Sequence, residues 1–596
     1  MKRPAPVDPR TAARLNECIA LYRKGDAAGA LAGVQKVLAK LPGQPDANLI
    51  ASVAMIALNR PEQALYHAER AAKAEPANGR HRLAVGTALM ALERPTEAIG
   101  ASRAGLERLP GDPEALAGLG SALARSGSYA EAEAVLRRAA GARPGWPDPV
   151  LTLGAMLLGT ARAHDAVEAL RPLVESDPRQ APAADTLALA SSYDDAIGPE
   201  EAFALHALYG RCVEALVPRI GAHANTREPG RRIRIGYLSA ELRSHSNSFF
   251  LRPILAHRDR DRFEVVCYHA SRHEDAVTAE LRSLVDGWVA CDQLNPLQLA
   301  QRIHRDRVDV LVELTGHFAR NRLPTMAARP APVQVTYLGY GNTTGLTTID
   351  ARIVDHDTDP APEADALATE RLVRLDRCFL AYRPDDDAPE PGEPTPDRPF
   401  TFGSFNDVKK LSPSVVRVWA AVLDRCPGAR LLIKTGELSH ASMRDLLAAR
   451  FAEHGVGPDR LTLMGRVDPE RAHLALYDQM DLALDTFPYA GTTTTCQALW
   501  QGVPVLTLAG RAHAGRVGVS LLRTAGEDGL IAPDEGAYVE LACAAFERGK
   551  LARAERLARR ERLRTTPLLD HAGHAKALER AYLELWERWC AGGTAR

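Results

Sequence analysis

The 596-residue sequence is poor in features that mark several protein classes. Aromatic residues make up only 5% of the chain, and no apolar stretch reaches the length of about 18 residues that predicts a membrane-spanning helix. Nine cysteines are scattered without any pair three positions apart, which excludes zinc or redox sites of the CxxC type. The first ten residues lack the apolar segment of a secretory signal. We therefore expect a cytoplasmic protein with reduced cysteines.

The chain has almost no net charge. Lys and Arg total 74 and Asp and Glu total 75, so the formal net charge is -1. A neutral chain has no overall attraction to nucleic acid or to an anionic membrane, although a local patch stays open. The apolar fraction of 46% and the charged fraction of 25% are typical of folded soluble protein and exclude a mainly disordered chain.

Small residues and prolines recur every 34 residues in the first third of the chain. Small residues let two helices pack closely, and proline cannot continue a helix, so the pattern predicts stacked helix pairs. It resembles the tetratricopeptide repeat, which implies a solenoid that docks a protein or peptide; the alternative is a stabilising cap or a dimerisation arm. The positions are Pro42, Pro76, Pro110, Pro144 and Pro178, with Ala30, Ala64, Ala98, Ala132 and Ala166, and with Gly86, Gly120 and Gly154.

Short β-rich runs alternate with helical stretches in the rest of the chain, which predicts two α/β halves with largely parallel sheets. A segment rich in Pro, Asp and Glu, residues 383–399, separates the halves. Ligands of such sheets bind at the carboxyl ends of the strands. The expected strands are 233–239, 263–269, 308–314, 333–338 and 352–354, then 400–405, 430–434, 461–464, 482–484 and 503–508, followed by a terminal helix over 575–590.

We therefore expect four parts along the chain. About five tetratricopeptide repeats occupy residues 1–182, and a helical junction, in which the 34-residue period is lost, occupies residues 183–231. An N-terminal lobe follows over residues 232–390, and a C-terminal lobe with its terminal helix covers residues 398–596. Neither GxGxxG after the first strand nor GxxxxGK[ST] is present, so neither a dinucleotide fingerprint nor a P-loop is supported.

The most informative segment for function is residues 484–500. A strand ends at Asp485, and a helix begins after Gly491 and four threonines at positions 492–495. Glycine lets backbone N–H groups approach a ligand, threonine hydroxyls add donors, and a helix N-terminus favours an anion. The segment predicts a phosphate cradle; the alternative is an ordinary threonine N-cap.

Other polar segments follow strands at the same expected edge. Residues 404–413 hold two adjacent lysines, and a lysine there either contacts a phosphate or is simply solvated. His245 either handles the proton of a hydroxyl or caps a helix at the surface. Residues 313–317 and 329–345 give polar and glycine-rich turns, and residues 513–520 offer the donors of Arg516.

Together these segments resemble the protein O-glycosyltransferases of the SPINDLY and O-GlcNAc transferase family over nearly the whole chain. The resemblance is closest to the SPINDLY branch, in residues 311–316, 329–335, 342–346, 485–496 and 518–522. It implies tetratricopeptide repeats before a GT-B glycosyltransferase of two Rossmann-like lobes. It further implies an inverting, metal-independent transfer of a sugar from a nucleotide donor to Ser or Thr of a protein, with no cofactor besides that donor.

The resemblance also assigns roles to residues of this sequence. Lys410 matches the lysine that contacts the donor phosphates, and His245 matches the histidine proposed to handle the acceptor proton. Asp309 falls where another polar active-site residue is found. The residues implied to surround the donor are Asn406, Asp407, His473, Gly491, Thr492, Thr493, Thr494, Gln497 and Arg516.

Three departures from the O-GlcNAc branch leave the donor open. That branch usually has lysine at Glu470, histidine at Thr492 and an acid at Gln497. UDP-GlcNAc, GDP-fucose and a CMP-nonulosonic acid are the candidate donors, and flagellin is a candidate acceptor because some bacterial relatives with short repeat arrays modify it. The alternative to an enzyme is a catalytically inactive repeat scaffold that binds partner proteins.

Overall fold

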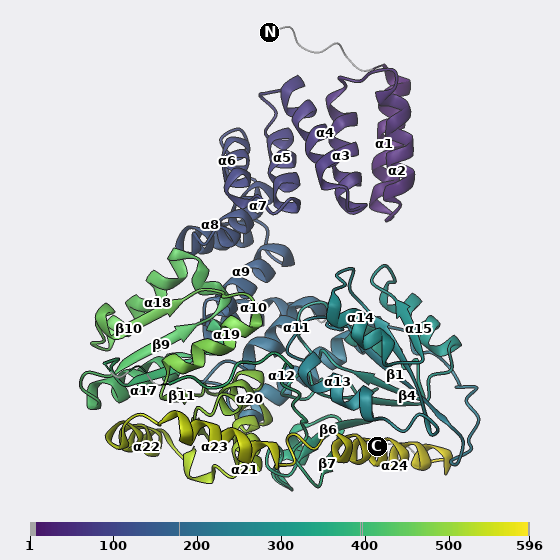
Figure 1. Cartoon of the computed structure of the whole chain (residues 1–596). Coiled ribbons are helices and arrows are strands. Elements are labelled where there is room, and N and C mark those ends of the chain that lie inside the picture. Colours follow the sequence, from purple (N-terminus) through teal and green to yellow (C-terminus); the bar gives the residue numbers. More distant parts are fainter. Residues whose placement is uncertain (1–7, 178, 394, 396, 594–596) are drawn as a thin grey trace. The chain divides into compact units, whose positions relative to one another are not determined.

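The computed structural model describes residues 8–177, 179–393, 395 and 397–593. It divides into two compact units, Met1–Met156 and Leu157–Arg596. The described part of the first unit is built from helices, whereas the second holds two β-sheets with their surrounding helices (Figure 1). Within the described ranges, no helix is long and apolar enough to span a membrane.

Six helix pairs in the described residues carry the 34-residue period. The first helices are α1 (Pro9–Arg23), α3 (Pro45–Ala57), α5 (Gly79–Ala91), α7 (Pro113–Arg125), α9 (Pro147–Gly159) and α11 (Ala181–Ser191). Their partners are α2 (Ala27–Leu38), α4 (Pro61–Ala74), α6 (Pro95–Leu106), α8 (Tyr129–Ala142), α10 (Ala163–Ser176) and α12 (Pro199–Leu216). From α3 to α11 each first helix begins 34 residues after the last, so the period extends into the stretch where the sequence pattern is lost.

The landmark residues explain the pairing. All five periodic alanines are fully buried in the second helices. A side chain at Gly120 in α7 would lie 2.5 Å from Leu136 of α8, so only glycine permits this approach of the two helices. The periodic prolines follow the ends of the second helices, while other prolines occupy the first turns of α3, α4, α6 and α7, where no N–H bond is lost. Pro178 lies outside the described residues.

Two parallel sheets form the centre of the second unit. In its described residues the first lobe has the strand order β3-β2-β1-β4-β5-β6-β7, and the second lobe has the order β10-β9-β8-β11-β12-β13. The first-lobe strands are β1 (Ile233–Ser239), β2 (Phe263–His269), β3 (Gly287–Ala290), β4 (Val310–Glu313), β5 (Val333–Thr336), β6 (Ala351–Asp355) and β7 (Arg371–Leu375). The second-lobe strands are β8 (Thr401–Ser404), β9 (Arg430–Lys434), β10 (Leu461–Met464), β11 (Leu482–Leu484), β12 (Val505–Leu508) and β13 (Ile531–Ala532).

In each sheet the strand order progresses outward in opposite directions from one pair of neighbouring strands. This pair is β1 and β4 in the first lobe and β8 and β11 in the second. Ligands of doubly wound sheets bind at such switch points, beyond the carboxyl ends of the strands. The loops after these four strands are therefore the places where this fold holds a ligand. The ten strands expected from the sequence are all present, and β3, β7 and β13 are additional.

The strands that the sequence did not predict are short or lie at the edges of a sheet. Edge strands are less buried, so their sequences carry a weaker hydrophobic pattern. Strand β3 is an edge strand whose residues are all at least partly exposed, β7 is the opposite edge, and β13 has two residues. Buried parallel strands such as β4 and β11 give the nearly continuous apolar runs that sequence patterns detect.

Helices cover both sheets. Those of the first lobe are α13 (Ser248–His257), α14 (Ala276–Ser283), α15 (Pro296–Arg305) and α16 (Leu323–Ala327). Those after β8 are α17 (Pro413–Arg425), α18 (Ala441–Glu453), α19 (Glu470–Ala475), α20 (Thr493–Trp500), α21 (Val517–Ala525), α22 (Glu535–Arg548), α23 (Arg553–Arg564) and α24 (His571–Cys590).

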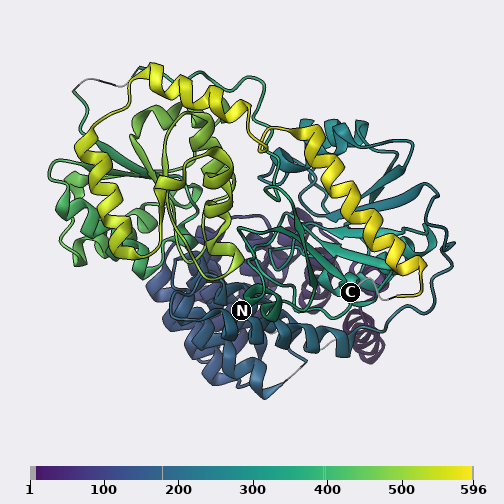
Figure 2. The same ribbon diagram turned by 90° about the horizontal axis from the view of Figure 1, so that it is seen from below.

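The terminal helix α24 returns to the first lobe. Figure 2 shows this yellow helix lying across the teal lobe. Its Tyr582 hydroxyl lies 3.3 Å from that of Tyr237 in β1, and its His574 lies 2.8 Å from the hydroxyl of Tyr337. A helix that follows the second lobe in sequence therefore packs on the first lobe.

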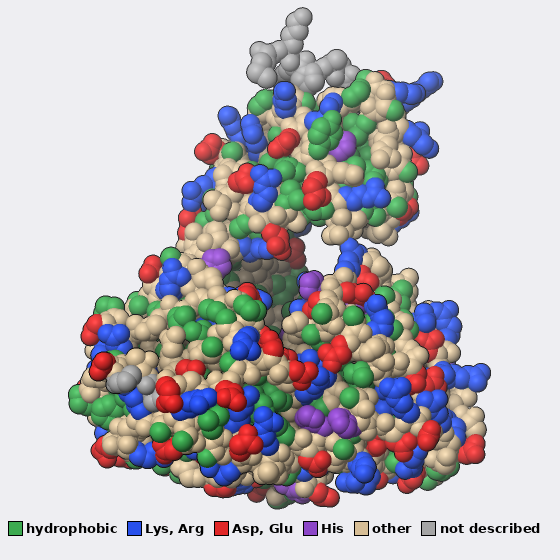
Figure 3. Space-filling model, viewed as in Figure 1, with side chains coloured by type: hydrophobic (Ala, Val, Ile, Leu, Met, Phe, Trp, Pro, Cys, Tyr) green, Lys and Arg blue, Asp and Glu red, His purple; other side chains and the backbone are tan. Residues whose placement is uncertain are grey.

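Positive and negative side chains are interspersed over the face seen in Figure 3, in keeping with the balanced charge of the sequence. No broad region of a single sign covers the described residues on that face. Exposed ion pairs of the described residues include Arg94–Glu97 and Arg417–Glu535.

Helices α11 and α12 pack directly on the first lobe. Tyr340 of the loop after β5 lies with its hydroxyl 2.9 Å from Ser192 Oγ and 2.7 Å from His206 Nε2. His317, after β4, pairs with Asp185 of α11 at 2.6 Å. The last helix pair of the repeat pattern is thus part of the same compact unit as the two sheets.

A glycine contact between α12 and the first lobe gives a stability prediction. A methyl group at Gly210 would collide with the carbonyl oxygen of Gly345, a backbone atom that cannot swing away. We expect Gly210→Ala to destabilise the second unit by about 1–3 kcal/mol, although alanine favours helix more than glycine does. Thermal unfolding checks this.

The matched control is Gly159→Ala, also in a helix but with nothing within 4 Å of the added carbon. This control should leave the unfolding temperature unchanged or raise it. Equal effects of the two substitutions would contradict the packing of α12 on the loop that contains Gly345.

Candidate active site

A buried aspartate shapes the loop between β11 and α20. Asp485 Oδ1 accepts the backbone N–H groups of Thr486 at 2.9 Å and Gly491 at 2.6 Å, and Oδ2 accepts the hydroxyl of Thr507 at 2.8 Å. A side chain at Gly491 would lie 2.7 Å from Thr494 Oγ1 and 3.0 Å from Asp485 Oδ1. Glycine is therefore required where the loop turns back on its own anchor.

The first turn of α20 has no side-chain cap among the described residues. Helix α20 begins at Thr493, and the side chain of Thr492, at the N-cap position, makes no capping hydrogen bond in the described part of the chain. The N-terminal N–H groups of a helix lack partners within the helix and carry partial positive charge. The structure therefore does not support the N-cap alternative for Thr492, and a helix start of this kind favours an anion.

Lys410 lies beside this helix end. It ends the short 3₁₀ turn Val408–Lys410, which Asp407 caps by accepting the backbone N–H of Lys409. The ammonium group of Lys410 donates to Ala490 O at 2.7 Å and lies 4.8 Å from the centre of the Tyr489 ring. Burial lowers the pKa of Lys410 to about 8. The lysine thus reaches the residue that precedes Gly491.

Asn406 joins the two loops. Its Oδ1 accepts the hydroxyl of Thr494 at 3.0 Å, and Asp407 pairs with Lys409 at 2.9 Å. The sequence-predicted residues Asn406, Lys410, Gly491 and Thr494 therefore meet at the switch point between β8 and β11.

A chain of hydrogen bonds borders the other end of α20. Lys434 Nζ donates to His473 Nδ1 at 2.6 Å, so His473 carries its proton on Nε2 and donates to Gln497 Oε1 at 3.2 Å. Gln497 Nε2 in turn donates to Glu470 Oε1 at 2.7 Å. Burial and then Lys434 lower the pKa of His473 to about 4, so the ring is neutral.

This relay accounts for two of the departures from the resembled family. Glu470 and Gln497 are hydrogen-bonded to each other. Lys434 supplies a cation at the other end of this series of hydrogen bonds, where it donates to His473. Burial raises the pKa of Glu470, and Lys434 opposes that shift.

His245 occupies the first-lobe side, in the loop after β1. Its side chain is 32% exposed, and its Nδ1 lies 3.3 Å from the carboxylate of Glu241. Burial, followed by Arg243 and Lys409, lowers the pKa of His245 to about 4. A neutral, partly exposed imidazole at the carboxyl end of β1 is suited to accept a proton.

Two sequence-predicted residues do not join this cluster. Asp309 precedes β4 and therefore lies at the amino ends of the strands, opposite the loops of the site. It is buried and forms an ion pair with Arg231 at 2.5 Å. It also accepts the backbone N–H of Arg234, so its role is to hold the start of β1. Arg516 donates to Asp357 O at 2.7 Å and Gly510 O at 3.1 Å and is occupied in bracing loops.

Several residues of the site were not among those predicted from the sequence to bind the donor or to act in catalysis. Asp485 and Lys434 each stand at a strand end, which is the one local indication of their place. Tyr193 stacks on Tyr489 at a ring distance of 4.7 Å, and Tyr489 also accepts the N–H of Gly341 at 3.3 Å. These contacts join positions far apart in the sequence.

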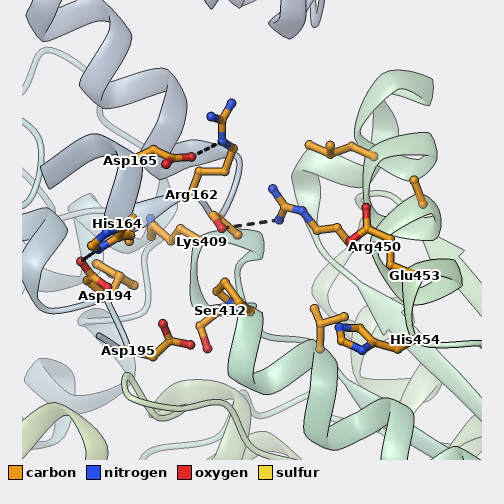
Figure 4. Close-up of a pocket in the computed structure, with 17 residues that line it drawn as sticks. Arg162, His164, Asp165, Asp194, Asp195, Lys409, Ser412, Arg450, Glu453 and His454 are labelled. Carbon is orange, nitrogen blue, oxygen red and sulfur yellow. Dashed lines mark hydrogen bonds and ion pairs between the residues drawn. The ribbon is translucent and has the colours of Figure 1, made fainter. Parts of the chain in front are cut away.

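A cavity of about 560 Å³ opens next to Lys409. Figure 4 shows Arg162, His164 and Asp194 on one side and Arg450 and His454 on the other. His164 pairs with Asp194 at 3.0 Å, and Arg450 donates to the carbonyl oxygen of Thr160 at 2.8 Å. The cavity lies between the last repeat helices of the second unit and helices α17 and α18.

Comparison with known proteins places the chain in a family. Residues 217–383 and 394–575 match the profile of Glycosyl transferase family 41, and residues 83–147 match a tetratricopeptide repeat. A solved structure of a point mutant of the Thermobaculum terrenum O-GlcNAc transferase aligns with a TM-score of 0.76 and 33% identity. That alignment covers 87% of this chain and 99% of the other.

Plant proteins are similar over the same region. The probable UDP-N-acetylglucosamine--peptide N-acetylglucosaminyltransferase SPINDLY of Solanum lycopersicum is 39% identical over 422 residues, which are 70% of this chain and 45% of the tomato protein. The SEC protein of Arabidopsis thaliana, which bears the same enzyme description, is 30% identical over 61% of this chain and 38% of its own length. The chain thus spans less than half the length of these curated relatives. From the matched lobes, the repeats and the shared fold, the chain belongs to glycosyl transferase family 41.

Proposed function

We propose that this protein is an inverting O-glycosyltransferase that moves a sugar from a nucleotide donor to Ser or Thr of a protein. One observation carries the proposal: Lys410 and the uncapped start of α20 converge at the switch point between β8 and β11. The names of its relatives agree, since the tomato protein is described as a peptide N-acetylglucosaminyltransferase and the bacterial structure as an O-GlcNAc transferase.

The donor side of the site is suited to a leaving nucleotide. Negative charge grows on the phosphate oxygen as the bond between sugar and phosphate breaks. The helix N–H groups and the Lys410 ammonium are aimed at that charge, so they bind the transition state more strongly than the ground state. These groups supply the positive charge that a metal ion would otherwise provide, which supports a metal-independent reaction.

The residues that would bind the rest of the nucleotide are those of the relay through His473 and Gln497. Both polar ends of the Gln497 amide are engaged, by His473 and by Glu470. A ribose or base at this place therefore meets a neutral imidazole and a half-exposed carboxylate. UDP-GlcNAc, GDP-fucose and a CMP-nonulosonic acid stay the candidate donors.

On the acceptor side, His245 would take the hydroxyl proton. Its neutral ring and partial exposure support that role. The cavity beside Lys409 offers a path for a polypeptide past the last repeat helices, and the repeats would recruit the protein. Flagellin stays the candidate acceptor on the resemblance alone.

The alternative of an inactive scaffold rested on Glu470 and Gln497. Because these two side chains form a satisfied hydrogen bond with each other, their presence does not require a decayed site. The intact contacts of Lys410 and Gly491 support the enzyme.

Titration of the purified protein with UDP, GDP and CMP tests the proposal. We expect measurable binding heat with a preference for one nucleotide, and Lys410→Ala should bind it about 10- to 100-fold more weakly, because a charged hydrogen bond is lost. The transfer rate of the variant should fall by about 100-fold or more.

The control is Lys576→Ala, which removes an exposed lysine of α24. It should change neither binding nor transfer. If no nucleotide binds the unmodified protein, the scaffold becomes the better account.

The pKa of Lys410, about 8, predicts an alkaline limit to activity. Below that pH the side chain is a cation and can neutralise the leaving phosphate; above it the charge is lost. We expect kcat/KM, which reports groups of the free enzyme, to fall tenfold per pH unit above about pH 8.

Lys410→Arg keeps a cation at every accessible pH. Its residual activity should lack this alkaline fall. An alkaline limb that persists unchanged in the arginine variant would assign the titration to another group.

A further inference from the structure

The loop after β1 holds a carboxylate against the imidazole of His245. Glu241 Oε2 lies 3.3 Å from His245 Nδ1, and the Glu241 side chain is only 13% exposed. Asn247 holds the same carboxylate oxygen, since its Nδ2 donates to Glu241 Oε2 at 2.7 Å and to Leu314 O at 3.0 Å. The carboxylate is therefore tied to the ends of both β1 and β4, the switch point of the first lobe.

The ring is held at its Nδ1 edge as well. The backbone N–H of Asn247 donates to Nδ1 at 3.3 Å, and the Ser248 hydroxyl donates to the carbonyl oxygen of His245 at 2.7 Å. Two partners thus compete for Nδ1: the amide favours a bare nitrogen, whereas an ionised Glu241 draws the proton onto it. Which nitrogen carries the proton then depends on the state of Glu241.

We propose that Glu241 is the positioning residue of His245, holding the proton on Nδ1 so that Nε2 is free to take the proton of the acceptor hydroxyl. This inference rests on the proposed function and assigns a role to a residue that the family resemblance did not supply.

The reaction step balances without further reagents. As the acceptor oxygen forms its bond to the anomeric carbon of the donor sugar, its proton moves to Nε2 of His245. The bond between that carbon and the phosphate oxygen breaks, and its electron pair leaves with the nucleotide. The imidazolium formed in this step faces the Glu241 carboxylate, which stabilises it, as the acid does in hydrolases of the Ser-His-Asp type.

The charged groups around the pair come from both lobes. Arg243 lies on the same loop, Lys409 comes from the second lobe, and Glu313 stands at the end of β4. Asp275 accepts the neighbouring N–H of Ser244 at 2.8 Å. Burial, and then Glu313, raise the pKa of Glu241 to about 7, against the opposing effects of Arg243 and Lys409.

A protonated Glu241 donates its hydrogen to Nδ1 and leaves the ring proton on Nε2, which then cannot accept another. Activity should therefore rise with pH as Glu241 ionises. Together with the alkaline fall assigned to Lys410, the expected profile of kcat/KM has its maximum between about 7 and about 8.

The test is the pH profile of kcat/KM for the full chain and for Glu241→Gln and Glu241→Asp. Glu241→Gln should lose about 100-fold at the optimum and should lack the acid limb. Glu241→Asp, which keeps a carboxylate, should recover much of the rate and the limb. Nucleotide affinity should change little in both, because the Glu241 carboxylate is hydrogen-bonded to Asn247 of the first lobe. An unchanged rate and acid limb in Glu241→Gln would overturn the proposal.

A readout without turnover separates this proposal from the proposed function. In protein labelled with 15N-histidine, the His245 signals are identified by their loss in His245→Gln. Above the pKa of Glu241 we expect the Nδ1–H form, and in Glu241→Gln a shift to the Nε2–H form. If the chain transfers no sugar from any donor but the tautomer shift occurs, the function fails and the pairing stands.

The converse result is an active protein in which His245 has the same tautomer in the wild type and in Glu241→Gln. It would overturn the pairing of Glu241 with His245 and leave the proposed function standing. If Glu241→Gln does not fold, the wild-type tautomer and the Glu241→Asp profile still decide. An Nε2–H form in the wild type above pH about 7 would then contradict the proposal.

Discussion

The buried carboxylate of Asp485 is the constraint on which the donor side depends. An unpaired carboxylate in this position would be costly, and three donors from the loop and from β12 satisfy it. Burial nevertheless raises its pKa. Because these bonds fold the loop back on itself, Ala490 O is presented to Lys410 and Gly491 leads directly into α20. The arrangement of Lys410, Gly491 and the start of α20 therefore depends on the Asp485 carboxylate.

Tyr489 joins three separate parts of the second unit. It comes from the second lobe, stacks on Tyr193 at the end of α11, and accepts an N–H from Gly341 of the first lobe. Lys410 lies over the same ring. The Tyr489 ring thus lies between Lys410 and Tyr193, which follows α11, so the last helix pair of the repeat pattern shares contacts with the lobes of the second unit.

Much of the fold could be predicted from the sequence because periodicity and buried strands leave local patterns. The 34-residue period and the continuous apolar runs indicated the helix pairs and the central strands, whereas the short strand β13 left no pattern. For the site, the Gly491–Thr494 turn and Lys410 could be found because they stand after strands. The resemblance did not indicate that Asp309 stands before β4, in an ion pair with Arg231, because it does not say at which end of a strand a residue stands.

The path of α24 has a consequence for how the protein is made. The first lobe emerges from the ribosome well before residues 571–590, yet Tyr237 of its central strand packs against Tyr582 of that helix. Trp586 and Leu585, both fully buried, belong to the same core. The lobe that holds His245 therefore waits with an apolar face uncovered until α24 has been synthesised. Nascent chains with such exposed surfaces are prone to aggregate, and this lobe would need protection by a chaperone until its last helix arrives.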